Sequence, residues 1–167
     1  MTFDKLRCAL YNCCKLNKRT DEDFLRSALA LARNAEKRGE VPVGALLVLD
    51  GRVIALGRNR RERNHDATAH AEVEAIRAGC QKVRGWRLEN CTLYVTLEPC
   101  PMCAGAIVNS RVKRVVFGAY DPKAGAVSSV LNLFDLPLNH KPEVTGGVLA
   151  EECGKMLTEF FRKKRKK

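Results

Sequence analysis

The chain has 167 residues, of which 46% are hydrophobic and 29% are charged, and its formal net charge is +11. This length and composition fit one globular domain with a buried core. No stretch approaches the about 18 uninterrupted apolar residues of a membrane span, and the charged N-terminus has no apolar block of signal-peptide length. We therefore predict a cytoplasmic protein without a membrane segment, in which the eight cysteines are metal ligands or free thiols and not disulfides.

The elements predicted in the first half of the chain are a helix, a hairpin and a second helix. Thr20 can cap a helix, with Asp23 three residues later, and Gly39 is a natural helix end. Asp50 and Gly51 form a tight-turn signal between two apolar runs. The predicted elements are a helix at 20–38, strands at 43–49 and 52–59, and a helix at 69–78 that Gly79 ends.

Strands and helices alternate in the second half. The predicted elements are a strand at 91–98, a helix at 100–109, a strand at 113–120, a loop at 121–129, a short helix at 131–134, a strand at 143–149 and a helix at 150–164. Alternating strands and helices indicate an α/β domain in which helices cover both faces of a mixed five-stranded sheet. The first hairpin supplies the antiparallel pair of that sheet.

The positive charge lies mainly at the two ends of the chain. Residues 162–167 are all basic, residues 1–19 carry a net charge of +4, and residues 20–161 are left with a net charge of only +1. We therefore divide the chain into a basic extension at 1–19 and a domain at 20–167 that ends in a basic tail at 162–167. Such ends suit a polyanion such as RNA, although a charge run alone favours the simpler interpretation of a solvated, disordered tail.

Cys100 and Cys103 form a C-x-x-C pair at the predicted start of a helix, directly after Pro99. Residues three apart share one face of a helix, and the positive end of the helix dipole favours the thiolate that binds zinc. A C-x-x-C pair by itself could equally be a redox pair.

His70 and Glu72 lie two residues apart, so in a regular helix they point about 200° apart. They can serve one site only at the start of a helix, which we place there with Thr68 as the N-cap. Alone, His70 would more simply be a core or capping residue. Together with Cys100 and Cys103 it makes three ligands suited to zinc, and three ligands leave a place for water. The candidates for a fourth ligand, none in a ligand-like pair, are His65, Cys80, Cys91 and Cys153.

The pattern H-x-E followed by P-C-x-x-C resembles the signature of the zinc-dependent nucleoside and nucleobase deaminases. The likeness to the tRNA-specific adenosine deaminases in this family runs from about Asp23 to Arg162, through EVPVGALLV, TAHAEVEAI, TLYVTLEPCPMCAGAI and DPKAGA. It implies a three-layer α/β/α cytidine-deaminase-like fold and a homodimer that binds the anticodon stem-loop of tRNA. The implied reaction is hydrolytic deamination of adenosine to inosine at the wobble position.

The resemblance also assigns roles to single residues. It implies one Zn²⁺ per chain, bound by His70, Cys100 and Cys103, with Glu72 moving the proton of a zinc-activated water. The implied substrate-binding residues are Asn59, which hydrogen-bonds the purine, Val43 and Ala71 at the base pocket, Pro99 before the cysteine helix, Asp121 and Lys123 near flanking nucleotides, and Phe160, Phe161 and Arg162 beside the RNA.

Two other classes of function remain open from the residues alone. A deaminase of a free base, nucleoside or nucleotide would use the same metal chemistry, and its candidate substrates are cytidine, cytosine, guanine and deoxycytidylate. A zinc-stabilised RNA-binding module without activity would need a fourth protein ligand and no Glu72. Arg58, Arg60, Arg61 and Arg63 could contact RNA or form an ordinary surface turn, and Cys8, Cys13 and Cys14 could form a second metal cluster or be unrelated thiols.

Overall fold

The computed structural model describes residues 19–166 around one mixed sheet. The strand order is β2-β1-β3-β4-β5, in which β1 is antiparallel to both β2 and β3, while β3, β4 and β5 are parallel. The strands are β1 Gly44–Leu49, β2 Arg52–Arg58, β3 Cys91–Leu97, β4 Arg114–Ala119 and β5 Glu143–Thr145. The predicted extension, with Cys8, Cys13 and Cys14, lies outside the described residues, apart from Arg19.

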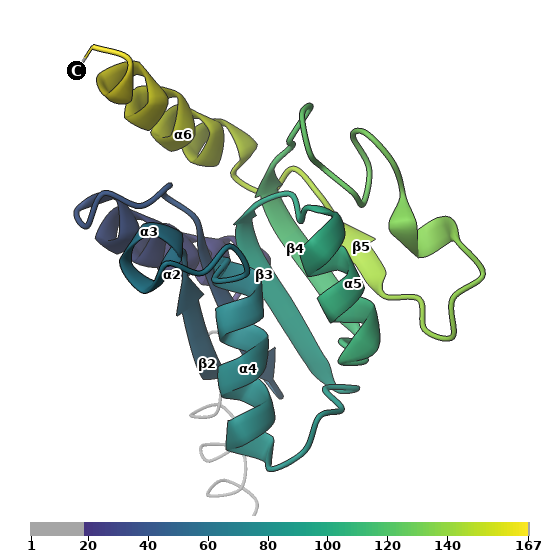
Figure 1. The fold of residues 1–167 in the computed structure, drawn as a ribbon. Helices are drawn as coiled ribbons and strands as arrows, with labels where there is room; N and C mark the ends of the chain where they lie inside the picture. Colours follow the sequence, from purple (N-terminus) through teal and green to yellow (C-terminus); the bar gives the residue numbers. More distant parts are fainter. Residues whose placement is uncertain (1–18, 167) are drawn as a thin grey trace, which may run out of the picture.

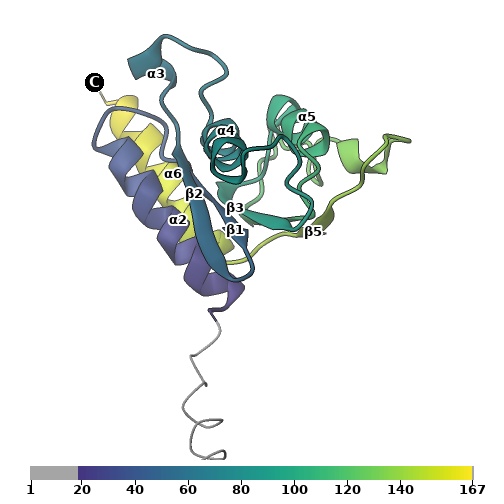
Figure 2. The same ribbon diagram turned by 90° about the horizontal axis from the view of Figure 1, so that it is seen from below.

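Helices cover both faces of the sheet (Figures 1 and 2). Helices α2 (Asp21–Glu36) and α6 (Ala150–Lys164) lie on one face, and α4 (Ala71–Val83) and α5 (Pro101–Asn109) lie on the other. Because neighbouring strand residues point to opposite faces, Leu46 packs in the core under α2, whereas Leu47 packs in the core under α4. The predicted α/β/α arrangement with a mixed five-stranded sheet is confirmed.

Helix α2 begins at the predicted capping box. The Thr20 hydroxyl accepts a hydrogen bond from the Asp23 amide at 3.3 Å, and the Asp23 carboxylate accepts one from the Thr20 amide at 2.8 Å. These two bonds satisfy amide groups that have no partner inside the helix. Gly39, whose φ is +80°, follows the helix in the left-handed conformation that glycine tolerates best.

A close approach of helix to strand brings the start of α4 onto the sheet. A Cβ atom on Gly57 of β2 would collide with the carbonyl oxygen of Ala71 and the amide of Ala75, both in α4. Glycine is therefore required there for the first turn of α4 to lie directly against the sheet.

Several predicted boundaries are wrong. Helix α4 does not stop at Gly79 but continues to Val83. A Cβ atom at Gly79 would meet the Leu47 side chain, so this glycine makes room for packing and does not end the helix. Its N-cap is His70, not Thr68, which bonds Asp66 in a turn. The last strand ends at Thr145, the short helix is a 3-10 turn at Leu133–Asp135, and helix α3 (Arg61–Asn64) was not predicted.

Within residues 19–166, no helix combines the length and the apolar character needed to cross a membrane.

Candidate active site

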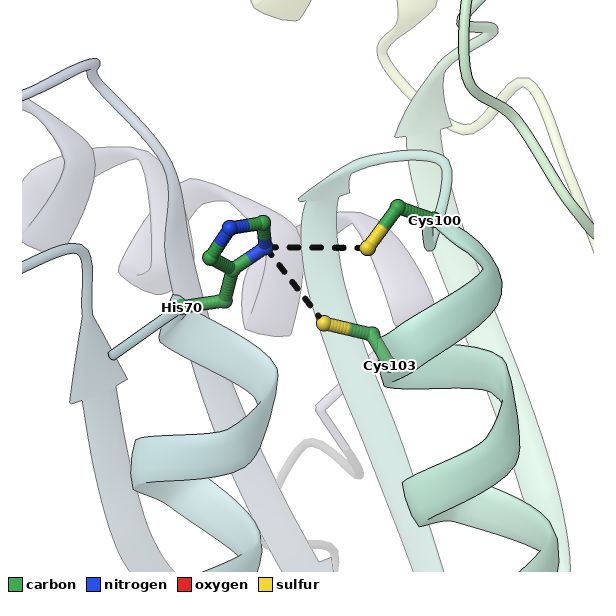
Figure 3. A group of neighbouring side chains, drawn as sticks. All are labelled: His70, Cys100 and Cys103. Atoms are coloured by element: carbon green, nitrogen blue, oxygen red, sulfur yellow. Dashed lines mark hydrogen bonds between the residues drawn. The ribbon is translucent and has the colours of Figure 1, made fainter. Parts of the chain in front are cut away.

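The candidate metal ligands lie at the starts of two helices on the same face of the sheet (Figure 3). His70 is the N-cap of α4, with φ −79° and ψ 153°, and Cys100 is the N-cap of α5, with φ −74° and ψ 172°. Since an N-cap residue has extended and not helical backbone, His70 and Glu72 are not held 200° apart. This local geometry lets a histidine and a glutamate two residues apart face one site.

The distances within this group fit a tetrahedral metal ion. His70 Nδ1 lies 3.7 Å from Cys100 Sγ and 3.6 Å from Cys103 Sγ, and all three ligand atoms lie within 4.8 Å of one another. A zinc ion with a Zn–N distance of about 2.0 Å and Zn–S distances of about 2.3 Å separates its ligands by about 3.5–3.8 Å. The donor set of one imidazole and two sulfurs therefore fits zinc.

No fourth protein ligand joins the group among residues 19–166. His65, Cys80, Cys91 and Cys153, the candidates considered from the sequence, are not among its members. Structural zinc sites almost always have four protein ligands, whereas catalytic sites keep one position for water or substrate. The three-ligand arrangement therefore favours a catalytic site over a purely structural one.

The two cysteines shift each other's pKa in opposite directions. The hydrogen bond from the Cys103 thiol, followed by that from His70, lowers the pKa of Cys100 to about 4. The hydrogen bond to Cys100, together with burial, raises the pKa of Cys103 well above its ordinary value. Cys100 is thus a thiolate at neutral pH, the form in which cysteine binds a metal.

Glu72 lies in the first turn of α4 and is only 4% exposed. Burial raises the pKa of its carboxyl group from the ordinary 4.5 to about 7. A carboxyl group with a pKa near neutrality can both accept and return a proton at working pH. Glu72 lines the same cleft as His70 and Cys100, as a general acid or base must.

That cleft has a volume of about 830 Å³ and is open at the ends of the helices. Five of the predicted substrate-binding residues line it, namely Val43, Asn59, Asp121, Lys123 and Phe161. The other four do not: Ala71 is buried in the core, Pro99 is buried, Phe160 is a residue of α6 that is only 7% exposed, and Arg162 is exposed on α6.

Asn59 is oriented by the start of α4. Its Oδ1 accepts a hydrogen bond from the Ala71 amide at 2.9 Å, and the residue is only 5% exposed. Because a backbone N–H can only donate, this bond fixes which end of the side-chain amide faces the helix. The Asn59 NH₂ group is left as a hydrogen-bond donor for whatever occupies the cleft.

Sequence reasoning missed part of the contribution of α6. The helix lines the cleft with residues at helical spacing: Gly154, Leu157, Thr158, Phe161, Lys164 and Arg165. The resemblance implied three consecutive residues of this helix, Phe160 to Arg162, as substrate contacts, although consecutive residues point to different sides of a helix. The i, i+3, i+4 spacing from Phe161 would have selected Lys164 and Arg165. Arg61 of α3, one of the four arginines that could contact RNA, also lines the cleft, and so does Tyr120 after β4, which was not predicted.

The fold and the site agree with the resemblance noted from the sequence. The chain belongs to the MafB19-like deaminase family, whose model matches residues 19–165. It is 53% identical over 148 residues to the tRNA-specific adenosine deaminase of Bacillus subtilis, which covers 88% of this chain and 92% of that protein. It is 54% identical over 153 residues to the tRNA-specific adenosine deaminase of Haemophilus influenzae, over 90% of this chain and 88% of that protein.

This chain is also similar to a solved structure from a study of A-to-I editing by tRNA:A34 deaminases at the wobble position of transfer RNA. Its TM-score is 0.78 at 49% identity, over 80% of this chain and 98% of that chain.

Proposed function

We propose that this protein is a tRNA adenosine deaminase that hydrolyses adenosine to inosine at the wobble position of the anticodon. One observation carries the proposal: His70 and Cys100 of a three-residue metal-ligating group line one cleft with the buried Glu72, in a chain at least 53% identical to two tRNA-specific adenosine deaminases. A deaminase of a free base or nucleoside would need no basic residues at the mouth of that cleft.

The metal would be one Zn²⁺ held by His70, Cys100 and Cys103. When bound, zinc supplies Lewis-acid activation of water at neutral pH. In the overall reaction, water replaces the amino group of adenine and ammonia leaves. Glu72 takes the proton of the water and transfers it to the purine ring, and a second transfer through the same carboxyl group helps the amine to leave. The Asn59 NH₂ group would donate a hydrogen bond that holds the purine in place.

The substrate partner would be the anticodon stem-loop of tRNA. Lys123, Lys164, Arg61 and Arg165 line the cleft and can bind phosphates around it. Burial is the main cause that lowers the pKa of Arg58, and the nearby charges of Arg60, Arg38 and Arg63 lower it further. Such a concentration of guanidinium groups beside α3 suits a polyanion. A loop base would enter the cleft most readily because extruding it breaks the least stacking.

We further propose a cytoplasmic homodimer. The segment after the cleft loop exposes four large apolar side chains, Val130, Leu131, Leu136 and Leu138, each at least 43% exposed. Clustered apolar exposure of this kind commonly marks an interface with another protein. A second copy of the chain would cover these residues.

The direct test incubates the purified protein with total tRNA and looks for inosine by nuclease digestion and mass spectrometry. Free adenosine, cytidine and guanine serve as parallel substrates. The proposal requires inosine in tRNA, with much slower conversion of the three free compounds. Rapid deamination of a free compound without inosine in tRNA would contradict it.

A further inference from the structure

Glu98 ends in a carboxylate that four donors from one distant loop surround. Its Oε1 accepts hydrogen bonds from the amides of Val127 at 3.3 Å and Ser129 at 2.8 Å. Its Oε2 accepts one from the Asp121 amide at 3.0 Å and one from the Ser129 hydroxyl. The residue is only 2% exposed. Hydrogen bonds from residues 121–129, which we call the Glu98 loop, therefore stabilise the buried carboxylate.

The Glu98 loop forms one wall of the cleft. The cleft is lined by four consecutive residues of this loop, Asp121, Pro122, Lys123 and Ala124. Glu98 itself lies two residues before Cys100, the first of the two candidate cysteine ligands. Pro99 adds a backbone contact, because its carbonyl oxygen accepts a hydrogen bond from the Ala126 amide at 2.9 Å. The two residues that follow β3, Glu98 and Pro99, therefore bond the cleft wall and lead directly into Cys100.

Gly125 shows independently that the loop is shaped around this carboxylate. A Cβ atom on Gly125 would collide with the carboxyl carbon and Oε2 of Glu98, and would lie 2.6 Å from the Asp121 carbonyl oxygen. The φ angle of Gly125 is not in the left-handed region, so glycine is needed here for space. Only a residue without a side chain lets the loop close over Glu98.

We propose that Glu98 is a positioning residue that holds the Glu98 loop as a preformed wall for the substrate. Glu98 is not a member of the metal-ligating group, and its carboxylate oxygens are bonded to the loop, so we assign it a contribution to substrate binding and not to the chemical step. The inference rests on the proposed function for the identity of the substrate, but the shape of the loop can be tested without turnover.

The first test is amide hydrogen exchange in Glu98→Gln. The amide side chain places an NH₂ group where an oxygen accepted hydrogen bonds, so at least one buried backbone amide loses its acceptor. We expect exchange in a peptide covering 121–131 to become about tenfold faster, and exchange in a peptide covering 59–66 to stay unchanged. Gly125→Ala should have the same effect, because it forces the loop away from an intact Glu98. Unchanged protection of 121–131 in both variants would overturn the proposal.

The second test separates binding from chemistry, using a synthetic anticodon stem-loop with adenosine at the wobble position. We expect KM to rise about tenfold in Glu98→Gln and in Gly125→Ala, with kcat within about threefold of the parent and one zinc per chain. Ser129→Ala removes one hydroxyl donor, keeps the backbone donors and should raise KM less. A fall in kcat at constant KM, or a loss of zinc, would contradict the proposal.

Asp21→Asn is the matched control. Asp21 is another carboxylate that accepts several hydrogen bonds, from Arg114 at 2.7 Å and 3.0 Å and from Tyr94 at 2.8 Å, but it is more exposed than Glu98 and lies at the start of α2. This variant should lose thermal stability and keep both KM and kcat. A rise in KM equal to that of Glu98→Gln would mean that general destabilisation is the cause. If the parent protein forms no inosine, the proposed function fails, whereas the exchange data still decide the role of Glu98.

Discussion

The candidate metal ligands and the walls of the cleft beside them are built differently. His70, Cys100 and Cys103 lie at or within the first turn of regular helices packed against the sheet. Two of the wall segments are held by buried carboxylates: Glu98 holds residues 121–129, and Glu40 accepts hydrogen bonds from the amides of Glu62 and Arg63 in the short helix α3.

The candidate ligands and the wall segments are therefore positioned by different kinds of contact. Helix starts are fixed by local backbone geometry and by core packing, so the ligands need few further contacts. The wall segments depend on hydrogen bonds from residues more than 20 positions away in sequence. We therefore expect substitutions in the metal group to stop the chemistry, and substitutions in the walls to change binding.

The largest effect should come from removing a metal ligand. Cys103→Ala should reduce bound zinc from one per chain to less than about one tenth and lower activity by more than about 100-fold, since even groups around metal ligands typically contribute about 10–100-fold. Zinc is measured by elemental analysis of the purified protein. Cys153→Ala is the control, because Cys153 is equally buried but belongs to α6, on the other face of the sheet. Equal zinc loss in both variants would contradict this assignment.

A smaller effect should come from replacing Asn59, which lines the cleft and bonds the start of α4. Asn59→Asp keeps an oxygen for the Ala71 amide but loses the donor that faces the cleft. We expect kcat/KM for the stem-loop to fall about 10–100-fold at nearly unchanged melting temperature. Asn59→Ala should lose both activity and stability, because it also leaves the Ala71 amide without its partner. If Asn59→Asp were as active as the parent, the purine contact would be wrong.

The smallest effect on RNA binding should come from removing two positive charges at the end of α6. Replacing Lys164 and Arg165 by glutamine should reduce the salt dependence of stem-loop binding by about two phosphate contacts, each worth a slope of about 0.7–0.9. Replacing Arg162 and Lys166 removes the same charge outside the residues that line the cleft. Fluorescence anisotropy at several salt concentrations measures both slopes. Identical slopes for the two double variants would mean that the tail acts only through its net charge.

The sequence predicts what local chemistry decides. The capping box at Thr20, the order of strands and helices, and the placing of Cys100 and Cys103 at a helix start all depend on neighbouring residues, and the structure confirms them. Gly79 was misread because its missing side chain makes room for Leu47, a contact between distant residues.

The walls of the cleft were less predictable for the same reason. Glu98 precedes Pro99 at the end of an apolar strand, and nothing near it in sequence shows that it binds a loop 23 to 31 residues later. The short helix α3 likewise depends on Glu40, which is 22 residues or more away. In contrast, the cleft-facing side of α6 follows from helical periodicity and was within reach of the sequence.

The most direct test of the account is single-turnover inosine formation by Glu72→Gln on the anticodon stem-loop, at a zinc content matched to the parent protein. Glutamine keeps the size of the side chain but cannot transfer the proton. We predict that the variant binds zinc and RNA like the parent and forms inosine about 10²–10⁴-fold more slowly. Inosine formation within threefold of the parent rate would contradict the assignment of Glu72 and, with it, the proposed mechanism.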